Sequence, residues 1–304
     1  MAQHTTTSGD DGARFCFANP ISSSMNSNVP VDTTVITDHE VHNQLKNIAK
    51  FFCDYASTLL SSGATTMRIQ RKVKQMAEAW DVEAIFTIMP ANVLFTLWDK
   101  EGEHSYTCIS PLAHAGINFD TITRLSRLSD QVFTEEVTLS EASDRLQEIK
   151  KIPRLNNWIV LLLAAAANAA FCRLFKGDWP AIGIVFFATL CGFFVKQRLQ
   201  AWKIDYRAVT VVAGVVAAVV SCVGLVDFSH YGLENFTLTD TPVTALGTSV
   251  LFLVPGVPFC NFVNDLIYGH YLSAWSRFVH AMMITVSLSL GLVIALLLFD
   301  IRMI

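Results

Sequence analysis

The spacing of hydrophobic and polar positions divides the chain into an amphipathic first half and an apolar second half. Across residues 39–60, apolar side chains recur every three or four positions, a spacing that predicts an amphipathic helix. Gly63 interrupts this spacing, which resumes across residues 65–80 and predicts a second helix. From Asn157 onward, apolar runs dominate. The pattern therefore predicts a soluble domain followed by a membrane domain.

The rest of the first half combines short strand-like runs with two further helical segments. Turn-forming residues separate the three runs, which predict a small antiparallel sheet. The predicted strands are residues 82–90, 92–99 and 104–110, and the predicted closing helices are residues 118–133 and 139–149. Thr138 or Ser140 is expected to cap the last helix. We therefore expect a small α+β domain at residues 39–152.

Residues 1–38 precede this domain and are rich in Ser, Thr, Asn and Gly. They contain no apolar core, so we expect a disordered tail. They also lack the basic start and the apolar stretch of a signal peptide, which leads us to expect the α+β domain in the cytoplasm.

The second half contains about five apolar segments. A helix needs about 20 residues to cross the hydrocarbon layer of a membrane, within a range of about 17 to 25. The segments are residues 158–175, 179–195, 208–226, 243–263 and 278–299, of which the second is short and the fourth is interrupted. Trp158, Trp179, Trp202 and Trp275 fall at the expected span ends, where aromatic rings prefer to lie. We therefore expect an α-helical membrane domain of about five transmembrane helices at residues 153–304.

Basic residues predict how this domain is oriented, because cytoplasmic loops are enriched in Lys and Arg. Such residues precede the first segment and separate the second from the third, whereas residues 227–240, between the third and fourth, contain none. We therefore expect a multi-pass protein with a cytoplasmic N-terminus and, for an odd number of spans, an external C-terminus. The basic residues are Lys150, Lys151, Arg154, Lys196, Arg198, Lys203 and Arg207.

Small residues repeat at four-residue intervals along two of these segments. Such spacing lets membrane helices approach closely, which is how bundles in membranes gain packing energy. A single anchor does not need several such faces, so the repeats favour a multi-helix bundle. They are Ala213, Ala217 and Ser221, then Gly214, Ala218 and Cys222, and finally Ser287, Gly291 and Ala295.

Composition narrows the classes of function. Charged residues make up 16% of the 304 residues, whereas soluble domains contain about 25%. The net charge of −4 argues against nucleic acid as a partner, because phosphate binding needs a concentrated basic face. Neither the seven cysteines nor Asp99, His104 and His114 fall in a metal-binding or catalytic motif. We therefore expect no enzyme, no metal and no cofactor.

The fourth apolar segment breaks its own pattern in the stretch LFLVPGVPFCNFVNDLIYGHY, residues 251–271. Prolines remove backbone donors, and polar and charged side chains are costly in hydrocarbon. The interrupting residues are Pro255, Gly256 and Pro258, followed by Asn261, Asn264 and Asp265.

Two interpretations of this interruption are open. In one, the span ends near Val254, and the remainder forms a turn and a cytoplasmic loop or interfacial helix. In the other, a broken helix restarts after Pro258 and offers its free amides to a substrate, as discontinuous helices do in many transporters. Arg277, near the start of the last span, is either a cytoplasmic anchor or the ion-pair partner of Asp265.

Three stretches, in this order, resemble the threonine/serine exporter (ThrE-type) family. LLSSGATTMRIQRKVKQMAEAW is similar to its helix pair, joined at Gly63 and Ala64 with Arg68 a few residues on. GINFDTITRLSRLSDQVFTEEVTLSEASDRLQEI is similar to its closing helices. LVPGVPFCNFVNDLIYGHYLSAWSR is similar to its proline-glycine-proline segment, followed by Asn, Asp and Gly. The resemblance extends over about residues 41–299.

This resemblance implies a cytoplasmic domain followed by membrane spans, an inner-membrane location and export of small hydrophilic metabolites. Full-length members carry two membrane halves, whereas this sequence contains one, so it resembles the first component of the split two-protein form. The implied partners are the lipid bilayer, a small membrane-protein subunit that supplies the second half, and a small carboxylate substrate. That substrate is either an amino acid of the threonine and serine type or the dicarboxylate succinate.

The resemblance also favours the functional interpretation of the interrupted segment. In the secondary transport that we expect, the substrate site comprises Pro255, Gly256, Pro258, Asn261, Asn264 and Asp265. Asp265 and Arg277 provide an ion pair or the coupling group. The alternative function is a membrane-anchored sensor or scaffold whose cytoplasmic domain binds a ligand or partner. The small-residue faces and the interrupted segment count against this alternative.

Overall fold

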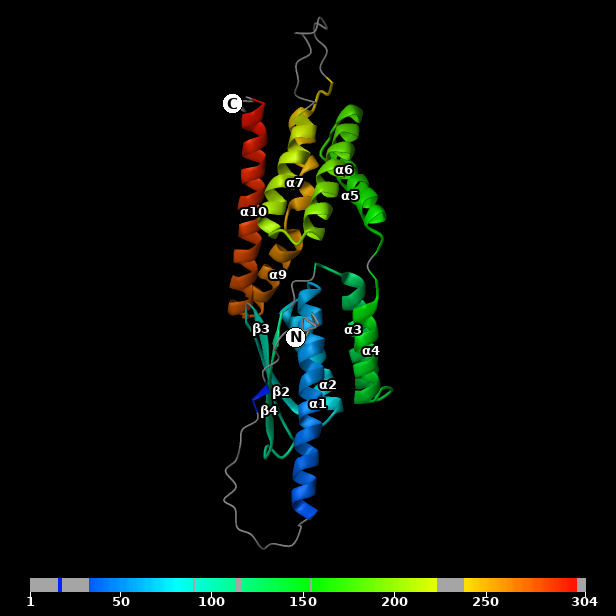
Figure 1. Cartoon of the computed structure of the whole chain (residues 1–304), viewed down its shortest axis with the longest axis vertical. Helices are drawn as coiled ribbons and strands as arrows, with labels where there is room; N and C mark the ends of the chain where they lie inside the picture. Colours follow the sequence, from blue (N-terminus) through cyan, green and yellow to red (C-terminus); the bar gives the residue numbers. More distant parts are fainter. Residues whose placement is uncertain are drawn as a thin grey trace, which may run out of the picture. The chain divides into compact units, whose positions relative to one another are not determined.

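The computed structural model describes residues 16–17, 33–89, 91–112, 116–153, 155–222 and 238–299 (Figure 1). The chain forms two compact units. Met1–Ile152 together with Cys260–Arg277 make the first unit, and Pro153–Phe259 together with Phe278–Ile304 make the second. Residues 260–277 were assigned to the membrane domain from the sequence, but they pack with the α+β domain. His114 lies outside the described residues.

The first unit contains the helices and strands expected from the sequence. Its four antiparallel strands lie in the order β1-β4-β3-β2, so β2 forms one edge of the sheet. The elements are β1 (Cys16–Phe17), α1 (Thr33–Ser61), α2 (Thr66–Ala79), β2 (Glu83–Ile88), β3 (Asn92–Trp98), β4 (Ser105–Pro111), α3 (Phe119–Phe133) and α4 (Leu139–Lys151). Strand β1 and the start of α1 fall within the expected tail, and the rest of that tail lies outside the described residues.

The core of the first unit lies between α1, the sheet and the closing helices. Phe52, Tyr55 and Leu59 follow the helical spacing of α1 and are fully buried. Phe95 belongs to the buried, alternating face of β3 and contacts the Phe52 ring. The Tyr55 hydroxyl donates a hydrogen bond to the Leu125 carbonyl oxygen at 3.0 Å and so joins α1 to α3. Burial raises the pKa of this tyrosine.

The expected cap of α4 is confirmed at Thr138. Its hydroxyl accepts a hydrogen bond from the Glu141 amide, and the Glu141 carboxylate accepts one from the Thr138 amide. This reciprocal pair satisfies two amides that have no acceptor inside the helix, which fixes where α4 begins.

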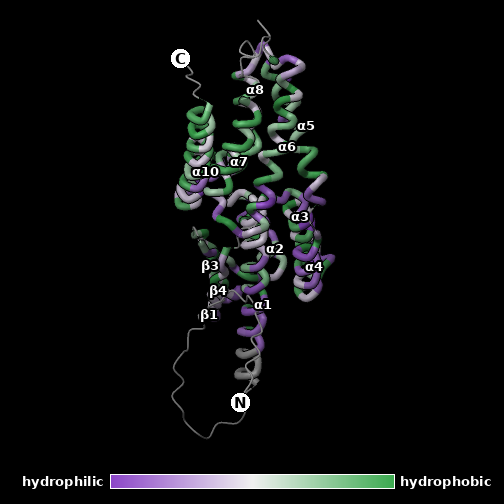
Figure 2. Tube along the Cα trace, turned by 45° about the horizontal axis from the view of Figure 1, so that its top comes forward, coloured by the Kyte–Doolittle hydropathy of each residue, from purple (hydrophilic) through white to green (hydrophobic). Residues whose placement is uncertain are grey.

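The remaining helices are mostly apolar (Figure 2). They are α5 (Asn157–Leu174), α6 (Trp179–Ala201), α7 (Tyr206–Ser221), α8 (Pro242–Ser249), a short 3-10 turn η3 (Leu251–Leu253), α9 (Gly256–Ile267) and α10 (Tyr271–Leu298). Among the described residues, α5, α6 and α10 are long and apolar enough to cross a membrane, and the bent pair of α8–η3 and α9 makes a fourth candidate. Helix α7 is shorter, and the expected continuation of this span beyond Cys222 lies outside the described residues.

Large apolar side chains on these helices are exposed on the surface of the second unit. Leu163 of α5, Phe187 of α6 and Val286 of α10 are each 60% exposed or more. The four tryptophans expected at span ends are also exposed and lie at or near helix ends, as membrane-interface residues do. They are Trp158, Trp179, Trp202 and Trp275. Both features fit helices that face a bilayer.

The small-residue faces pack helices closely, as the sequence predicted. A Cβ added at Gly192 of α6 would lie 2.8 Å from the Ala217 Cβ of α7. A Cβ added at Gly291 of α10 would lie 2.7 Å from the Val211 carbonyl oxygen of α7. Both distances are shorter than van der Waals contact, so only glycine allows these helices to approach so closely.

Polar contacts at both ends anchor α8 within its bundle. Asp178, at the start of α6, accepts hydrogen bonds from the Thr239 and Thr241 hydroxyls at 2.5 and 2.8 Å, just before α8 begins. Burial acts to raise the pKa of Asp178, but these bonds and two from backbone amides outweigh it and hold the pKa at about 2. At the other end of α8, the Thr189 hydroxyl of α6 donates to the Ser249 carbonyl oxygen at 3.3 Å. The segment before the break is therefore fixed at both ends.

We predict that Gly291→Ala destabilises the helix bundle by about 1–3 kcal/mol, because the added methyl group must push α7 and α10 apart. The matched control is Gly183→Ala in α6, where a Cβ meets nothing within 4 Å. Removing a helical glycine there should be neutral or stabilising by about 0.5–1 kcal/mol. Thermal unfolding of the full chain in detergent measures both. Equal stability of the two variants would contradict the close packing of α7 and α10.

Candidate functional site

The interruption is a bend between two helical segments. Helix α8 and turn η3 end at Leu253, and the next helix is bent by 65° from them. The sequence predicts a restart after Pro258, whereas α9 begins at Gly256 and contains Pro258 in its first turn. Amides in the first turn of a helix have no intrahelical acceptor, so a proline there costs no hydrogen bond. The segment after Pro255 is therefore helical, not a loop.

Asp265 is the most completely buried of the predicted site residues, with an exposure of 0%. Its Oδ1 accepts a hydrogen bond from the Thr66 amide at 3.1 Å. Its Oδ2 accepts one from the Thr66 hydroxyl at 2.9 Å and lies 2.9 Å from Arg277 Nε. Three donors therefore converge on this one carboxylate, two from the first turn of α2 and one from α10.

Arg277 and Asn261 bind the same turn through its carbonyl oxygens. Arg277 Nη2 donates to the Ala64 carbonyl oxygen at 2.8 Å, in addition to its ion pair with Asp265. Asn261 Nδ2 donates to the Gly63 carbonyl oxygen at 2.8 Å. Because Asn261 and Asp265 are four residues apart, they share one face of α9, as the sequence predicted. The name clasp is used below for the side chains of Asn261, Asp265 and Arg277 together with the turn at residues 63–66.

The turn at residues 63–66 has a shape that its sequence requires. Gly63 has a φ of +94°, a conformation that side chains rarely adopt. A Cβ added there would also lie 3.2 Å from Ile117 Cγ1. Thr65 then caps α2 by accepting the Arg68 amide at 3.3 Å. The left-handed glycine and the cap together present the Gly63 and Ala64 carbonyl oxygens and the Thr66 donors to one partner.

Asn264 lies on α9 beside Asp265 and has an unmet hydrogen-bonding group. Its Oδ1 is buried and has no hydrogen-bond partner within the described parts of the chain. Buried polar atoms in proteins are nearly always paired, so an unpaired acceptor in a site points to a missing donor. Asn264 Oδ1 is therefore a candidate acceptor for a donor that the described residues do not supply.

The predicted site residues fall into two groups along α9. Pro255, Gly256 and Pro258 lie at its start, whereas Asp265 lies near its end. At a rise of about 1.5 Å per residue, Gly256 and Asp265 are separated by about 13 Å along the helix axis. A small carboxylate is too short to bind both the amides at the start of α9 and the clasp. The two groups therefore do not form one site for a single small ligand.

Sequence reasoning identified the polar residues of α9 and α10 but missed Thr66 and the function of the turn. Thr66 and Asp265 are separated by 199 residues, and no local periodicity connects them. The signal for this contact in the sequence is that the Gly63-Ala64 pair and the cluster of Asn261, Asn264 and Asp265 each stand out as a motif. Two isolated motifs of this kind are candidates for contacting each other.

We predict that Arg277→Met lowers the free energy of unfolding of the first unit by about 3–5 kcal/mol, because it leaves the buried Asp265 carboxylate without its counter-charge. The matched control is Arg207→Met. Arg207 also pairs with an aspartate at 2.9 Å, but both side chains of this pair are about half exposed, and exposed pairs contribute little to stability. Thermal unfolding of the full chain measures both variants. A loss no larger in Arg277→Met than in the control would contradict the buried ion pair.

Comparisons with known proteins extend these observations. The sequence model of the family described as "ThrE: Putative threonine/serine exporter" matches residues 50–299. This range includes the α1–α2 turn, the break before α9 and both residues of the ion pair. No solved structure matches the chain.

Several curated relatives are similar over most of the chain. The "Probable succinate transporter subunit YjjP" of Klebsiella aerogenes is 24% identical over 260 residues, which are 86% of this chain and 97% of that protein. The protein of the same name from Escherichia coli strain K12 is 25% identical over 244 residues, 80% of this chain and 91% of that protein. A "Probable threonine/serine exporter" of Mycobacterium tuberculosis is 20% identical over 243 residues, 79% of this chain and 44% of that protein.

Proposed function

The chain belongs to the threonine/serine exporter family, and we propose that it is one component of a secondary transporter that exports small hydrophilic carboxylates. A small second membrane subunit supplies the other half. Two relatives are named as subunits of a succinate transporter, which supports a partner subunit. A further relative is named as a probable threonine/serine exporter, which adds amino acids of that type to the candidate substrates. The candidate substrates are therefore succinate and amino acids of the threonine and serine type.

The observation that carries this proposal is the set of donors around Asp265. The Thr66 amide, the Thr66 hydroxyl and the Arg277 guanidinium bind one carboxylate at 2.9–3.1 Å. Charge-assisted hydrogen bonds of this kind are the usual means by which proteins recognise carboxylates. In the proposed mechanism, the substrate carboxylate replaces that of Asp265 on Arg277 and Thr66. Asp265 takes up a proton as it leaves, because an unpaired carboxylate is costly in a buried site.

Asn264 supplies a means of discriminating between the two substrate classes. Its buried Oδ1 can accept a hydrogen bond from the ammonium or hydroxyl group of a threonine-like amino acid. Ionised succinate has no donor and leaves this oxygen unpaired. A site that pairs a substrate's donor rejects analogues that lack it more strongly than a purely apolar site does.

We place the clasp at the cytoplasmic surface of the inner membrane. This placement is supported by the grouping of Cys260–Arg277 with the α+β domain and by the basic residues in the loop after α6. In the proposed topology, the N-terminus is cytoplasmic, about five spans cross the bilayer and the C-terminus is external. Three long apolar helices and the bent pair support four of these spans, and α7 supplies the fifth.

We predict that Asp265→Asn reduces the initial rate of carboxylate efflux at least about tenfold, since asparagine retains the shape of the side chain but cannot ionise or carry the exchanged proton. The measurement is efflux of labelled succinate and of labelled threonine from cells that express the chain with its candidate membrane partner. Wild type and variant are compared at equal membrane levels. The substrate whose efflux depends on the wild-type chain identifies the class.

The matched control is Asp205→Asn, which removes an aspartate that pairs with an arginine at an exposed site. Its efflux should equal that of the wild type. Unchanged efflux of both substrates in Asp265→Asn would remove this residue from the mechanism. If the wild-type chain and its partner export neither substrate, the anchored sensor or scaffold becomes the better account.

A further inference from the structure

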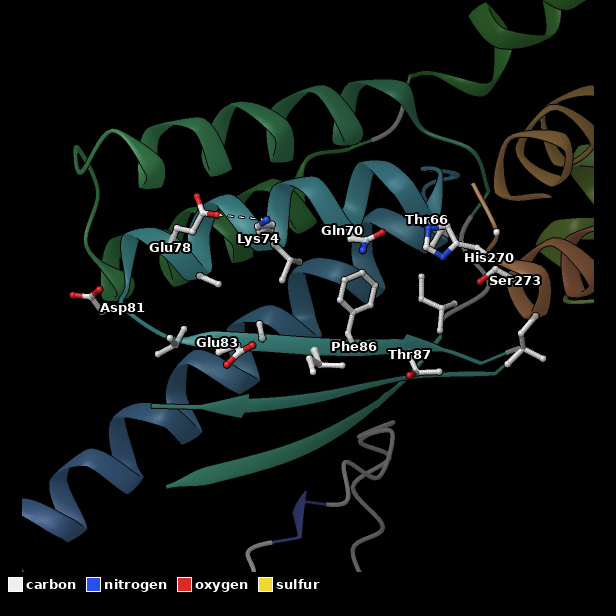
Figure 3. A pocket seen from close by; sticks show the side chains of 18 of the residues that line it. Thr66, Gln70, Lys74, Glu78, Asp81, Glu83, Phe86, Thr87, His270 and Ser273 are labelled. Carbon is white, nitrogen blue, oxygen red and sulfur yellow. Dashed lines mark ion pairs between the residues drawn. The ribbon is translucent and has the colours of Figure 1, made fainter. Parts of the chain in front are cut away.

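A cavity of about 890 Å³ lies between α2, the edge strand β2 and the N-terminal turn of α10 (Figure 3). All of its lining residues belong to the first unit. Its volume falls in the range of about 300–1,000 Å³ that small-molecule sites occupy. Val73 of α2 and Phe86 of β2 contribute apolar surface, and polar residues lie toward both ends. Thr66 lines one end, so the cavity shares a residue with the clasp.

The end of the cavity at Thr66 is formed by the start of α10. Gly269, His270, Tyr271, Leu272 and Ser273 all line the cavity there. The first amides of a helix have no intrahelical acceptor, and they carry the positive end of the helix dipole. No acidic side chain lies in the first turn of this 28-residue helix. This end of the cavity therefore offers donors and positive potential, and the carboxylate bound to Thr66, that of Asp265, is already paired with Arg277.

Ser273 is the second observation that points to a ligand at this end. The residue is only 8% exposed, and its hydroxyl has no hydrogen-bond partner among the described residues. Figure 3 shows the hydroxyl directed toward the cavity, with the His270 ring beside it and Thr66 nearby. Because most of the residue is buried and its hydroxyl faces the cavity, the acceptor for this hydroxyl is water or a ligand within the cavity. The helix amides and this hydroxyl require the same kind of partner, an acceptor with several lone pairs.

The acidic residues of the cavity do not oppose an anion at this end. Figure 3 shows Glu78, Asp81 and Glu83 toward the opposite end. Glu78 and Asp81 are paired with lysines at 3.9 and 2.7 Å, and Asp99, which also lines the cavity, lies 2.9 Å from the His104 ring. Glu83 lies four residues from Thr87 along β2, about 13 Å at the rise of an antiparallel strand, and Figure 3 shows Thr87 toward the α10 end. Distance therefore weakens the repulsion between Glu83 and an anion at that end.

We propose that the α10 end of this cavity binds the carboxylate of a small molecule. The amides of the first turn of α10 and the Ser273 hydroxyl donate to the carboxylate oxygens, and the apolar wall at Val73 and Phe86 contacts the carbon chain. The choice of a small carboxylate as ligand rests on the proposed function. Because Thr66 belongs to both the cavity and the clasp, the site holds its ligand beside the donors that now bind Asp265. It is a cytoplasmic collection site for the exported carboxylate.

The test is a calorimetric titration of the purified full chain in lipid nanodiscs. The probes are sodium succinate, L-threonine and inorganic phosphate. We expect Ser273→Ala to weaken binding of the favoured carboxylate about tenfold or more, since a hydrogen bond to a charged group is lost. Ser276→Ala is the matched control, because Ser276 lies on the same helix but does not line the cavity. Its dissociation constant should equal that of the wild type.

A second variant keeps the test independent of how Ser273→Ala folds. Leu272 is 53% exposed and lines the cavity, so Leu272→Glu should fold and place an acid on the first turn of α10. An acid at a helix start is compatible with the helix, but it competes with the ligand for the same amides. We expect carboxylate binding to fall below detection in this variant.

Three results would overturn the collection site. They are no carboxylate binding by the wild type, equal affinity of Ser273→Ala and Ser276→Ala, and phosphate binding as tight as that of the carboxylates. These outcomes are separable from failure of the proposed function. Efflux by the wild type without Ser273-dependent binding removes only the collection site. Ser273-dependent binding without any efflux removes the transport function and leaves the site.

Discussion

The contact on which the first unit depends is the buried ion pair between Asp265 and Arg277. Neither charge is stable alone in a buried position, so each requires the other and the donors around it. Arg277 also binds the Ala64 carbonyl oxygen, and Asp265 also binds Thr66. The pair therefore fixes the turn between α1 and α2, whose left-handed Gly63 fits beside Ile117. Through these contacts, the ends of α9 and α10 become part of the α+β domain.

The same arrangement explains how a structural contact can serve transport. Three donors hold the Asp265 carboxylate, and they would bind a substrate carboxylate with the same chemistry. In the proposed mechanism, the substrate carboxylate and the Asp265 carboxylate compete for these donors, so substrate binding and an intact clasp exclude each other. The unpaired Asn264 oxygen and the Ser273 hydroxyl lie on the same two helices. Both are polar groups that the fold leaves unsatisfied, as expected near a ligand.

Sequence patterns predicted the elements well, because local physics decides them. The spacing around Phe52, Tyr55 and Leu59 defined α1, and the repeat at Gly291 correctly indicated close helix packing. The predicted start of α9, after Pro258, was too late in the sequence, because a proline is tolerated within the first turn of a helix. Only part of the clasp could be predicted from the sequence. The shared face of Asn261 and Asp265 follows from helical spacing. Their contact with the turn at residues 63–66 joins residues that are far apart in the sequence, and no local pattern encodes it. The number of membrane spans stays a prediction, because part of the third segment lies outside the described residues.

The central claim is that a substrate carboxylate displaces the Asp265 carboxylate from Arg277 and Thr66, and that Asp265 is protonated as it leaves. Substrate-induced infrared difference spectroscopy of the full chain with its partner tests this most directly, with isotope-labelled substrate to shift the ligand's own bands. The account predicts that substrate produces the band of a protonated carboxyl group, and that this band is absent in Asp265→Asn. If substrate binds but no such band appears, or if the band persists unchanged in the variant, the claim is contradicted.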